Sequence, residues 1–271
     1  MNTFFLDRLN SEPHALAFAG QSTPWPVALA DQSANPALDE ALHTHAAAAQ
    51  ALLYPVSAEL LATTGRPVDL FGFEPNPARL GAAAAASASV PGIALTQLGA
   101  LLDAAALGYN PAQAKPVAVL GHSQGVLAVH MVQAICEAGS IDAAAAKIDE
   151  ILAIATLIGV AGTRQARQLG LAARHGEATP MLSVKDITRA QVDALIERVD
   201  GARGPIAVAV TNSATHYVLS GYPEDLAAFG VKVAKEHKRQ AKLREEKVRG
   251  GRVFDPTLEY LDVTLPFHSP L

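Results

Sequence analysis

Residues 117–127 read VAVLGHSQGVL, a short apolar run that leads into the pattern Gly-x-Ser-x-Gly at Gly121, Ser123 and Gly125. The apolar run predicts a buried strand, and the residues that follow the serine predict a helix ending near Glu137. Where a strand turns sharply into a helix, glycines relieve crowding of the backbone and the serine hydroxyl projects from the turn. The stretch therefore predicts a reactive serine at one edge of a sheet.

The first two thirds of the chain alternate apolar strands with helical segments. The segments we expect are a strand at Leu16–Ala19 and helices at Leu38–Ala62, Ile93–Leu107 and Asp142–Gly159. Such alternation is typical of a mostly parallel sheet with helices on both faces. We therefore predict an α/β fold with an α/β-hydrolase-like parallel-sheet core, formed by residues 1–177 and 253–271.

From about residue 180 the pattern changes to the order β-α-β-β-α-β. The predicted elements are Met181–Val184, Thr188–Val199, Ile206–Thr211, His216–Ser220, Pro223–Lys242 and Leu258–Leu265. This order is that of the ferredoxin-like motif, which forms a compact unit inside larger α/β domains. We place an inserted ferredoxin-like subdomain at residues 178–252, with the final strand either completing it or returning to the core.

Composition excludes several classes of protein. The single cysteine, Cys136, forms no internal disulfide and gives no metal-ligand spacing. The start, Met1–Asn10, lacks the order of a secretory signal, so we expect a cytoplasmic protein. Leu80–Leu102 is uncharged and long enough to cross a bilayer, but Pro91-Gly92 is expected to divide it into a loop and a buried helix, so no membrane span is predicted. Nucleic-acid binding lacks a motif.

A serine needs a base within hydrogen-bond reach to act as a nucleophile near neutral pH. Of the nine histidines, His268 is the leading candidate, because it follows the last predicted strand in a loop that can reach the edge of a sheet. The backbone N–H of Gln124, at the start of the predicted helix, can stabilise an oxyanion beside Ser123.

Three motifs together resemble the acyl-CoA:acyl carrier protein transacylase family. They are Phe18–Gln21, Gly121–Gly125 and Phe267–Leu271, and they occur in the order of that family. Asn212-Ser213 and Val218–Gly221 resemble strands of its smaller subdomain. Glutamine after the serine is similar to the fungal and bacterial type I fatty acid synthase branch.

The resemblance implies a role for each matching residue. Ser123 carries the acyl group, His268 is the general base and then acid, and the backbone amides of Gln21 and Gln124 form the oxyanion hole. Substrate-binding positions are Gly121, His122, Asn212 and Ile158. The implied substrate is the coenzyme A thioester acetyl-CoA. The acceptor is a phosphopantetheine thiol on acyl carrier protein, and the other partners are further domains of a multienzyme synthase. No metal and no covalently bound cofactor are implied.

The pair Ile158-Gly159 matches the place where malonyl-selective members have an Arg-Gly pair. An apolar side chain there leaves a malonyl carboxylate buried and unpaired, which favours a neutral acetyl group. Two arginines farther along the same helix, Arg164 and Arg167, are the alternative source of positive charge, and ordinary helix packing is the alternative role for Ile158.

Lys and Arg are concentrated in Lys232–Arg252, in a chain whose net charge is −5. A run of charge is most simply a solvated helix face. The alternative is electrostatic steering of an acidic partner, either the phosphates of coenzyme A or the carrier protein.

Three other interpretations remain. Because members of the family continue beyond the position of His268, we expect this chain to be a fragment of a larger synthase. An α/β-hydrolase-type thioesterase shares the serine turn, but it needs an acidic residue between Ser123 and His268 to orient the base, and Asp262 is expected on a strand. A non-catalytic docking domain would have no reactive serine.

Overall fold

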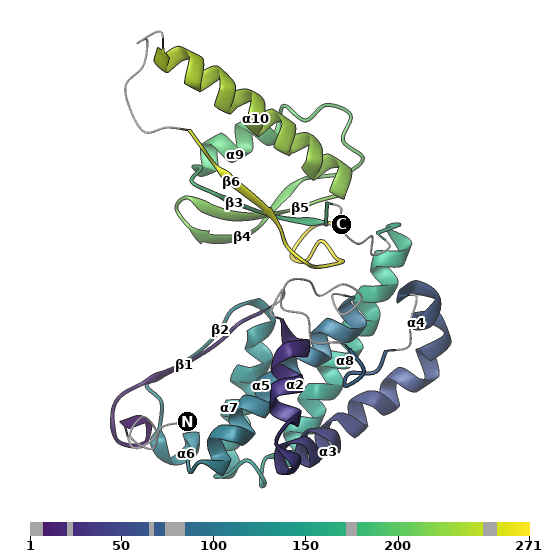
Figure 1. Cartoon of the computed structure of the whole chain (residues 1–271), viewed down its shortest axis with the longest axis vertical. Coiled ribbons are helices and arrows are strands. Elements are labelled where there is room, and N and C mark those ends of the chain that lie inside the picture. The colour runs from purple at the N-terminus through teal and green to yellow at the C-terminus, as the bar shows by residue number, and fades with distance from the viewer. Residues whose placement is uncertain (1–7, 21–23, 65–67, 74–84, 172–177, 246–253) are drawn as a thin grey trace. The chain divides into compact units, whose positions relative to one another are not determined.

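The computed structural model describes residues 8–20, 24–64, 68–73, 85–171, 178–245 and 254–271. The chain divides into two compact units, Met1–Arg167 and Gln168–Leu271 (Figure 1). Each unit combines helices with its own sheet, so the predicted mixed α/β class is confirmed. The more specific α/β-hydrolase-like description stays a prediction.

The first unit contains a parallel pair of strands, β1 (Ala15–Phe18) and β2 (Ala118–Gly121), which lie side by side in Figure 1. Their register places Phe18 opposite Gly121, so both strands end at the same edge. Helix α7 (Val126–Ala138) follows β2 after the short 3-10 helix η3 (Ser123–Gly125) and packs against both strands. The predicted order of strand, turn and helix around Ser123 is therefore confirmed. The expectation of a buried strand is wrong, since no residue of β2 is buried and Leu120 is 59% exposed.

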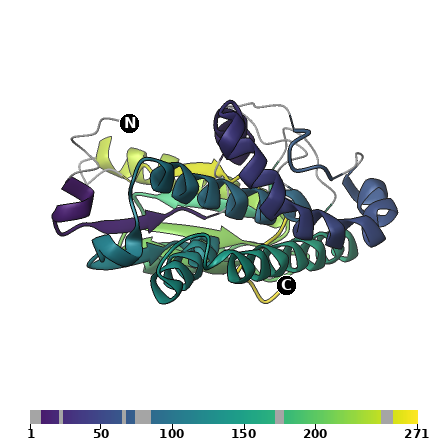
Figure 2. The same cartoon turned by 90° about the horizontal axis from the view of Figure 1, so that it is seen from below.

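The other secondary-structure elements described in this unit are mainly α-helices (Figure 2). They are α2 (Trp25–Ser33), α3 (Pro36–Leu53), α4 (Ser57–Thr64), α5 (Ala86–Ala106), α6 (Pro111–Ala114) and α8 (Ala145–Gln168). The single helix expected at Leu38–Ala62 is wrong, because the 3-10 turn η1 (Tyr54–Val56), which contains Pro55, separates α3 from α4. Helix α8 begins later and ends later than expected.

Helix α5 is the buried centre of the first unit. Pro91 and Gly92 are expected in a loop but lie inside this helix. A Cβ on Gly92 would come within 2.5 Å of the Trp25 ring, so glycine is needed where α5 packs against α2. Among the described residues, α5 is the one helix long and apolar enough to span a membrane, and 67% of that window is buried within the protein. Packing of this kind is typical of a core helix.

The second unit has the predicted order β-α-β-β-α-β. Its elements are β3 (Met181–Lys185), α9 (Arg189–Ile196), β4 (Ala207–Ser213), β5 (His216–Ser220), α10 (Pro223–Glu245) and β6 (Thr257–Tyr260). The strands form one antiparallel sheet in the order β4-β5-β3-β6, so the first and third strands of the motif are central. Both helices contribute to the buried cluster on one face of this sheet.

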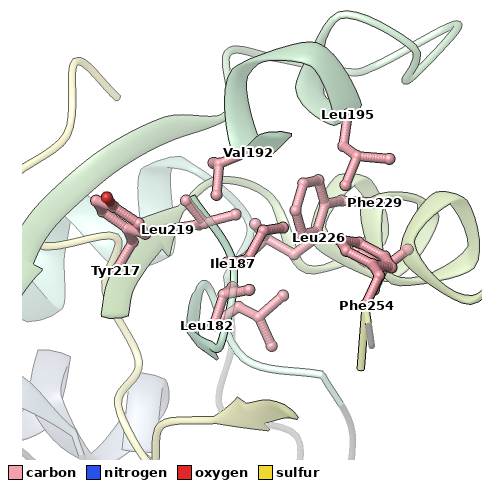
Figure 3. Close-up of a cluster of buried hydrophobic side chains, with 11 residues drawn as sticks. Leu182, Ile187, Val192, Leu195, Tyr217, Leu219, Leu226, Phe229 and Phe254 are labelled. Carbon is pink, nitrogen blue, oxygen red and sulfur yellow. The ribbon is translucent and has the colours of Figure 1, made fainter. Parts of the chain in front are cut away.

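Large apolar side chains from α9, α10 and the strands fill the space between the helices and the sheet (Figure 3). Phe229 and Leu226 of α10 are fully buried there against Leu219 of β5. Side chains alternate between the two faces of a strand, so Met181, Ser183 and Val218 lie on the opposite face. A second cluster, which includes Met181, Val218, Val263 and Phe267, covers part of that face.

The last strand differs from the expected domain boundary. The sequence pattern assigns residues 253–271 to the α/β core, whereas Thr257–Tyr260 pairs with β3 and completes the small sheet. The strand also ends at Tyr260 instead of Leu265. Beyond it, Leu261 is held by hydrogen bonds, since its N–H donates to the Met181 carbonyl and its own carbonyl accepts from Thr179 Oγ1.

Asp225 provides a test of how the second unit is stabilised. Its carboxylate is 4% exposed and accepts hydrogen bonds from the backbone N–H groups of Arg203 and Gly204, each at 3.0 Å. We expect Asp225→Ala to lower the free energy of unfolding by about 2 kcal/mol, because two backbone N–H groups lose a buried, charged acceptor. Glu224→Ala is the control: its exposed pair with Arg203 is worth at most about 1 kcal/mol. Urea denaturation measures both, and equal effects would contradict the assignment.

Candidate active site

Ser123 has a left-handed backbone, with φ of +53°. This region disfavours residues that carry a Cβ, and such conformations concentrate at functional sites. Among the described residues, Lys115, Asp186 and His268 are the other non-glycine residues with positive φ. Two of these four positions are thus the predicted nucleophile and the predicted base.

Three glycines, Gly20, Gly121 and Gly125, allow the chain to close around Ser123. A Cβ on Gly121 would lie 2.5 Å from the backbone of Gly125 and Val126, so the strand and the helix meet without side chains between them. A Cβ on Gly125 would collide with the carbonyl oxygens of Phe18 and Ala19 at the end of β1. The Gly-x-Ser-x-Gly pattern is therefore required by backbone contacts at this turn.

The segment after β1 packs directly onto the turn. A Cβ on Gly20 would lie 2.6 Å from the His122 carbonyl oxygen and 3.1 Å from Ser123 Cβ. The N–H of His122 donates to the Phe18 carbonyl at 2.9 Å, and that of Gly125 donates to the His122 carbonyl at 2.9 Å. The end of β1 and the serine turn thus form one tightly packed backbone junction.

One of the two predicted oxyanion donors, Gln124, belongs to this junction. Gln124 follows Ser123 directly, and its side-chain Nε2 donates to the Val90 carbonyl of α5. Gln21 lies outside the described residues, one position after Gly20. Gly121 and His122 are exposed residues; Gly121 ends β2 and His122 follows it. Their assignment to the site stays a prediction.

Ile158 and Gly159 lie on α8 and differ in environment. The Ile158 side chain is 46% exposed, whereas Gly159 is buried. A Cβ on Gly159 would lie 2.5 Å from the Ala86 carbonyl oxygen and 3.1 Å from Ser87 Cα, so glycine is needed where α8 crosses the start of α5. The pair therefore combines a packing position with an accessible apolar side chain.

Arg164, the alternative charge on α8, forms a bidentate ion pair. Its Nε and Nη2 donate to the two carboxylate oxygens of Glu59 on α4 at 2.9 and 2.8 Å. The hydrogen bond from Arg164 lowers the pKa of the Glu59 carboxyl, so this carboxylate is ionised at neutral pH. Arg164 thus already has a carboxylate partner within the protein.

His268 and Asn212 belong to the second unit. His268 is exposed, and the segment before it is anchored by the buried side chains of Val263 and Leu265 and by Phe267 in the second cluster. Its own φ is +56°. Ser123 lies in the first unit, so the pairing of Ser123 with His268 stays a prediction.

Asn212 has polar neighbours that the sequence did not single out. Its Nδ2 lies 3.4 Å from His216 Nε2, and Ser183 Oγ lies 3.1 Å from the same nitrogen. Ser183 lies on the same face of the sheet as Met181, and Phe267 packs on that face as well. Only the strand register could have revealed this group, because 33 residues separate Ser183 from His216. Among the described residues no cluster of His, Cys, Asp or Glu could hold a metal ion.

The strain at Ser123 can be measured with two substitutions. At a left-handed position we expect Ser123→Gly to be more stable than Ser123→Ala by about 1 kcal/mol, because alanine keeps the Cβ that this region disfavours. Ala161 is an exposed position inside helix α8, where alanine is favoured over glycine. Ala161→Gly should therefore lower the free energy of unfolding by about 1 kcal/mol. Urea denaturation gives all three values. A Ser123→Ala variant more stable than Ser123→Gly would show that the turn is not left-handed.

Comparisons with known proteins agree with this geometry. Residues 180–260 match the family model described as the fatty acid synthase central AT domain. The chain is 27% identical over 164 residues to the fatty acid synthase beta subunit hexB of Dothistroma septosporum, covering 56% of this chain and 8% of that protein. It is 27% identical over 203 residues to the beta subunit TOXC of Cochliobolus carbonum, covering 68% and 9%. The chain thus spans less than a tenth of these two relatives.

The fold is also shared with a solved transacylase. The structure of the malonyl CoA-acyl carrier protein transacylase from Coxiella burnetii matches 96% of this chain and 64% of its own, with a TM-score of 0.52 and 19% identity. The fold of this chain is therefore that of the transacylases. Together with the fungal relatives and the family model, this confirms the resemblance drawn from the sequence: the chain is similar to the acyltransferase domain of a type I fatty acid synthase.

Proposed function

We propose that the chain is an acyltransferase of fatty acid biosynthesis, which moves an acetyl group from coenzyme A to the phosphopantetheine thiol of acyl carrier protein. One observation carries the proposal: Ser123 has a left-handed backbone in a glycine-packed turn between a strand and a helix. This geometry is the nucleophile elbow, which exposes a serine hydroxyl at the end of a sheet. The family match and the fungal relatives support the same reaction class.

In the proposed first half-reaction, Ser123 Oγ attacks the thioester carbonyl while the His268 imidazole accepts the hydroxyl proton. The carbonyl oxygen becomes an oxyanion, which the backbone N–H groups of Gln124 and Gln21 stabilise. The carbon–sulfur bond then breaks, and the sulfur of coenzyme A leaves with the proton from His268. An acetyl ester on Ser123 remains.

The second half-reaction reverses these steps with a different thiol. The phosphopantetheine thiol of the carrier protein gives its proton to His268 and attacks the ester. The bond between the acetyl carbon and Ser123 Oγ breaks, and Oγ regains a proton from His268. Each oxyanion donor is expected to contribute a few kcal/mol to both transition states, because it is fixed before charge develops.

Two features of α8 support acetyl as the acyl group. Ile158 offers an apolar side chain where malonyl selectivity needs a cation, and Arg164 is already paired with Glu59. Binding a malonyl carboxylate through Arg164 would require breaking this bidentate pair. A neutral acetyl group needs no charged partner.

Intact mass after brief exposure to acetyl-CoA or malonyl-CoA tests the reaction and its selectivity. We expect acetyl labelling of the wild-type chain, little malonyl labelling, and no labelling of Ser123→Ala. An Ile158→Arg variant should gain malonyl labelling, because it supplies the missing cation. Malonyl labelling of the wild-type chain would overturn the selectivity, and absence of labelling by both thioesters would overturn the proposed activity.

Helix α10 is the proposed contact for the carrier protein. Lys235, Lys238 and Lys242 are exposed and, spaced by three and four residues, lie on one face of the helix. The same helix also carries two cations that pair with acidic residues, since Arg239 pairs with Glu236 and Lys232 with Asp200. The lysine face would attract an acidic carrier protein.

Charge reversal tests this contact. We expect Lys235→Glu, Lys238→Glu and Lys242→Glu together to lower kcat/KM for the carrier protein roughly tenfold at low salt. Labelling by acetyl-CoA should be unchanged, because that half-reaction does not use the carrier. The control reverses Lys115, Lys147 and Arg189, which changes the net charge equally. Equal losses in both variants would mean that net charge, not this face, determines the rate.

A further inference from the structure

Helix α5 is hydrogen-bonded to both chain segments that meet at Ser123. Gln97 Nε2 donates to the Ala19 carbonyl oxygen at 2.7 Å, at the end of β1. Gln124 Nε2 donates to the Val90 carbonyl oxygen of α5. Val90 and Gln97 are seven residues apart, which is two turns along one side of a helix. The helix therefore bridges the two segments from one side.

These bonds lie close to Ser123 along both chain segments. The Ala19 carbonyl belongs to the peptide that leads into Gly20, and Gly20 packs against the His122 carbonyl and Ser123 Cβ. Gln21 is the next residue. Gln124, the other proposed donor, bonds to α5 directly, because its own side chain donates to the Val90 carbonyl. Each proposed donor is thus at most two residues from a bond to α5.

The part of α5 between these bonds is well fixed. Val90 is 2% exposed, Leu95 1%, and Ile93 and Ala94 are fully buried. A helix packed in this way moves little relative to the core, so it can hold two backbone segments at a constant separation.

We propose that Gln97 and the side chain of Gln124 are positioning residues, which use α5 to hold the end of β1 against the turn that carries Ser123 and the backbone N–H of Gln124. This inference rests on the proposed acyltransferase function. Oxyanion donors must lie 2.7–3.1 Å from the developing charge, so a small displacement of the β1 segment weakens transition-state binding more than substrate binding. Gln97 touches no reacting atom and acts through Ala19.

A matched control is Gln32 of α2, which bonds to the same helix α5. Gln32 Nε2 donates to the Thr96 carbonyl of α5 at 2.9 Å, one residue from Gln97. The Oε1 atoms of both glutamines are buried and have no hydrogen-bond partner. Gln32→Leu and Gln97→Leu therefore remove the same type of bond from the same helix, but only Gln97 is bonded to the β1 segment.

The test is single-turnover acylation by acetyl-CoA, with the rate and the KM measured separately for wild type, Gln97→Leu and Gln32→Leu. We expect Gln97→Leu to lower the rate about 10- to 100-fold with KM nearly unchanged, since removal of a whole oxyanion donor costs about 10²- to 10³-fold. Gln32→Leu should retain the wild-type rate. Urea denaturation of both variants shows whether they are equally folded.

Several outcomes would overturn the inference. They are a wild-type rate in Gln97→Leu, an equal loss in Gln32→Leu, or a raised KM with an unchanged rate. If the wild-type chain itself forms no acyl-enzyme, the proposed function fails, and that result is distinct from all three. Gln97→Glu provides a second variant, because its carboxylate cannot donate to the Ala19 carbonyl. It should lose at least as much rate as Gln97→Leu.

Discussion

The close approach of Gly125 to the carbonyl oxygens of Phe18 and Ala19 is the contact on which the first unit depends. No side chain fits there, so the start of α7 lies directly against the end of β1. This approach aligns β1 with β2, places Gly20 beside the turn and leaves Ser123 in a left-handed conformation. The strain at Ser123 is therefore a consequence of backbone packing, and the same packing projects its hydroxyl from the turn.

The second unit is built on a different constraint, a sheet with two unlike faces. One face carries the apolar cluster shared with α9 and α10, and the other carries the polar group of Ser183, Asn212 and His216 and the segment that leads to His268. After β6 pairs with β3, the segment that follows it packs on this second face of the sheet. The predicted base thus lies on a strip anchored by Val263, Leu265 and Phe267.

Sequence reasoning succeeded where a local pattern determines the structure. The turn at Ser123 follows from glycine spacing between an apolar run and a helix, and the β-α-β-β-α-β order follows from alternating strand and helix patterns. It failed where contacts between residues far apart in the sequence determine the structure. The sequence pattern predicts a loop at Pro91 and Gly92, but both lie inside α5, where Gly92 packs against Trp25 of α2, a helix that the pattern did not predict. Pairing of β6 with β3 also depends on a partner about 70 residues away, which spacing cannot reveal.

For the site, the sequence could identify residue types but not contacts. Gln97 bonds to the backbone of a residue 78 positions away, and Arg164 pairs with a carboxylate 105 positions away, so neither contact can be read from the sequence. The central claim is that Ser123 carries an acyl group destined for a thiol. Fragmentation mass spectrometry after acetyl-CoA treatment, followed by addition of phosphopantetheinylated carrier protein, tests it most directly. The account predicts acetyl on Ser123 that disappears only when the carrier is added. Acetyl on another residue, or equal loss to water without the carrier, would contradict it.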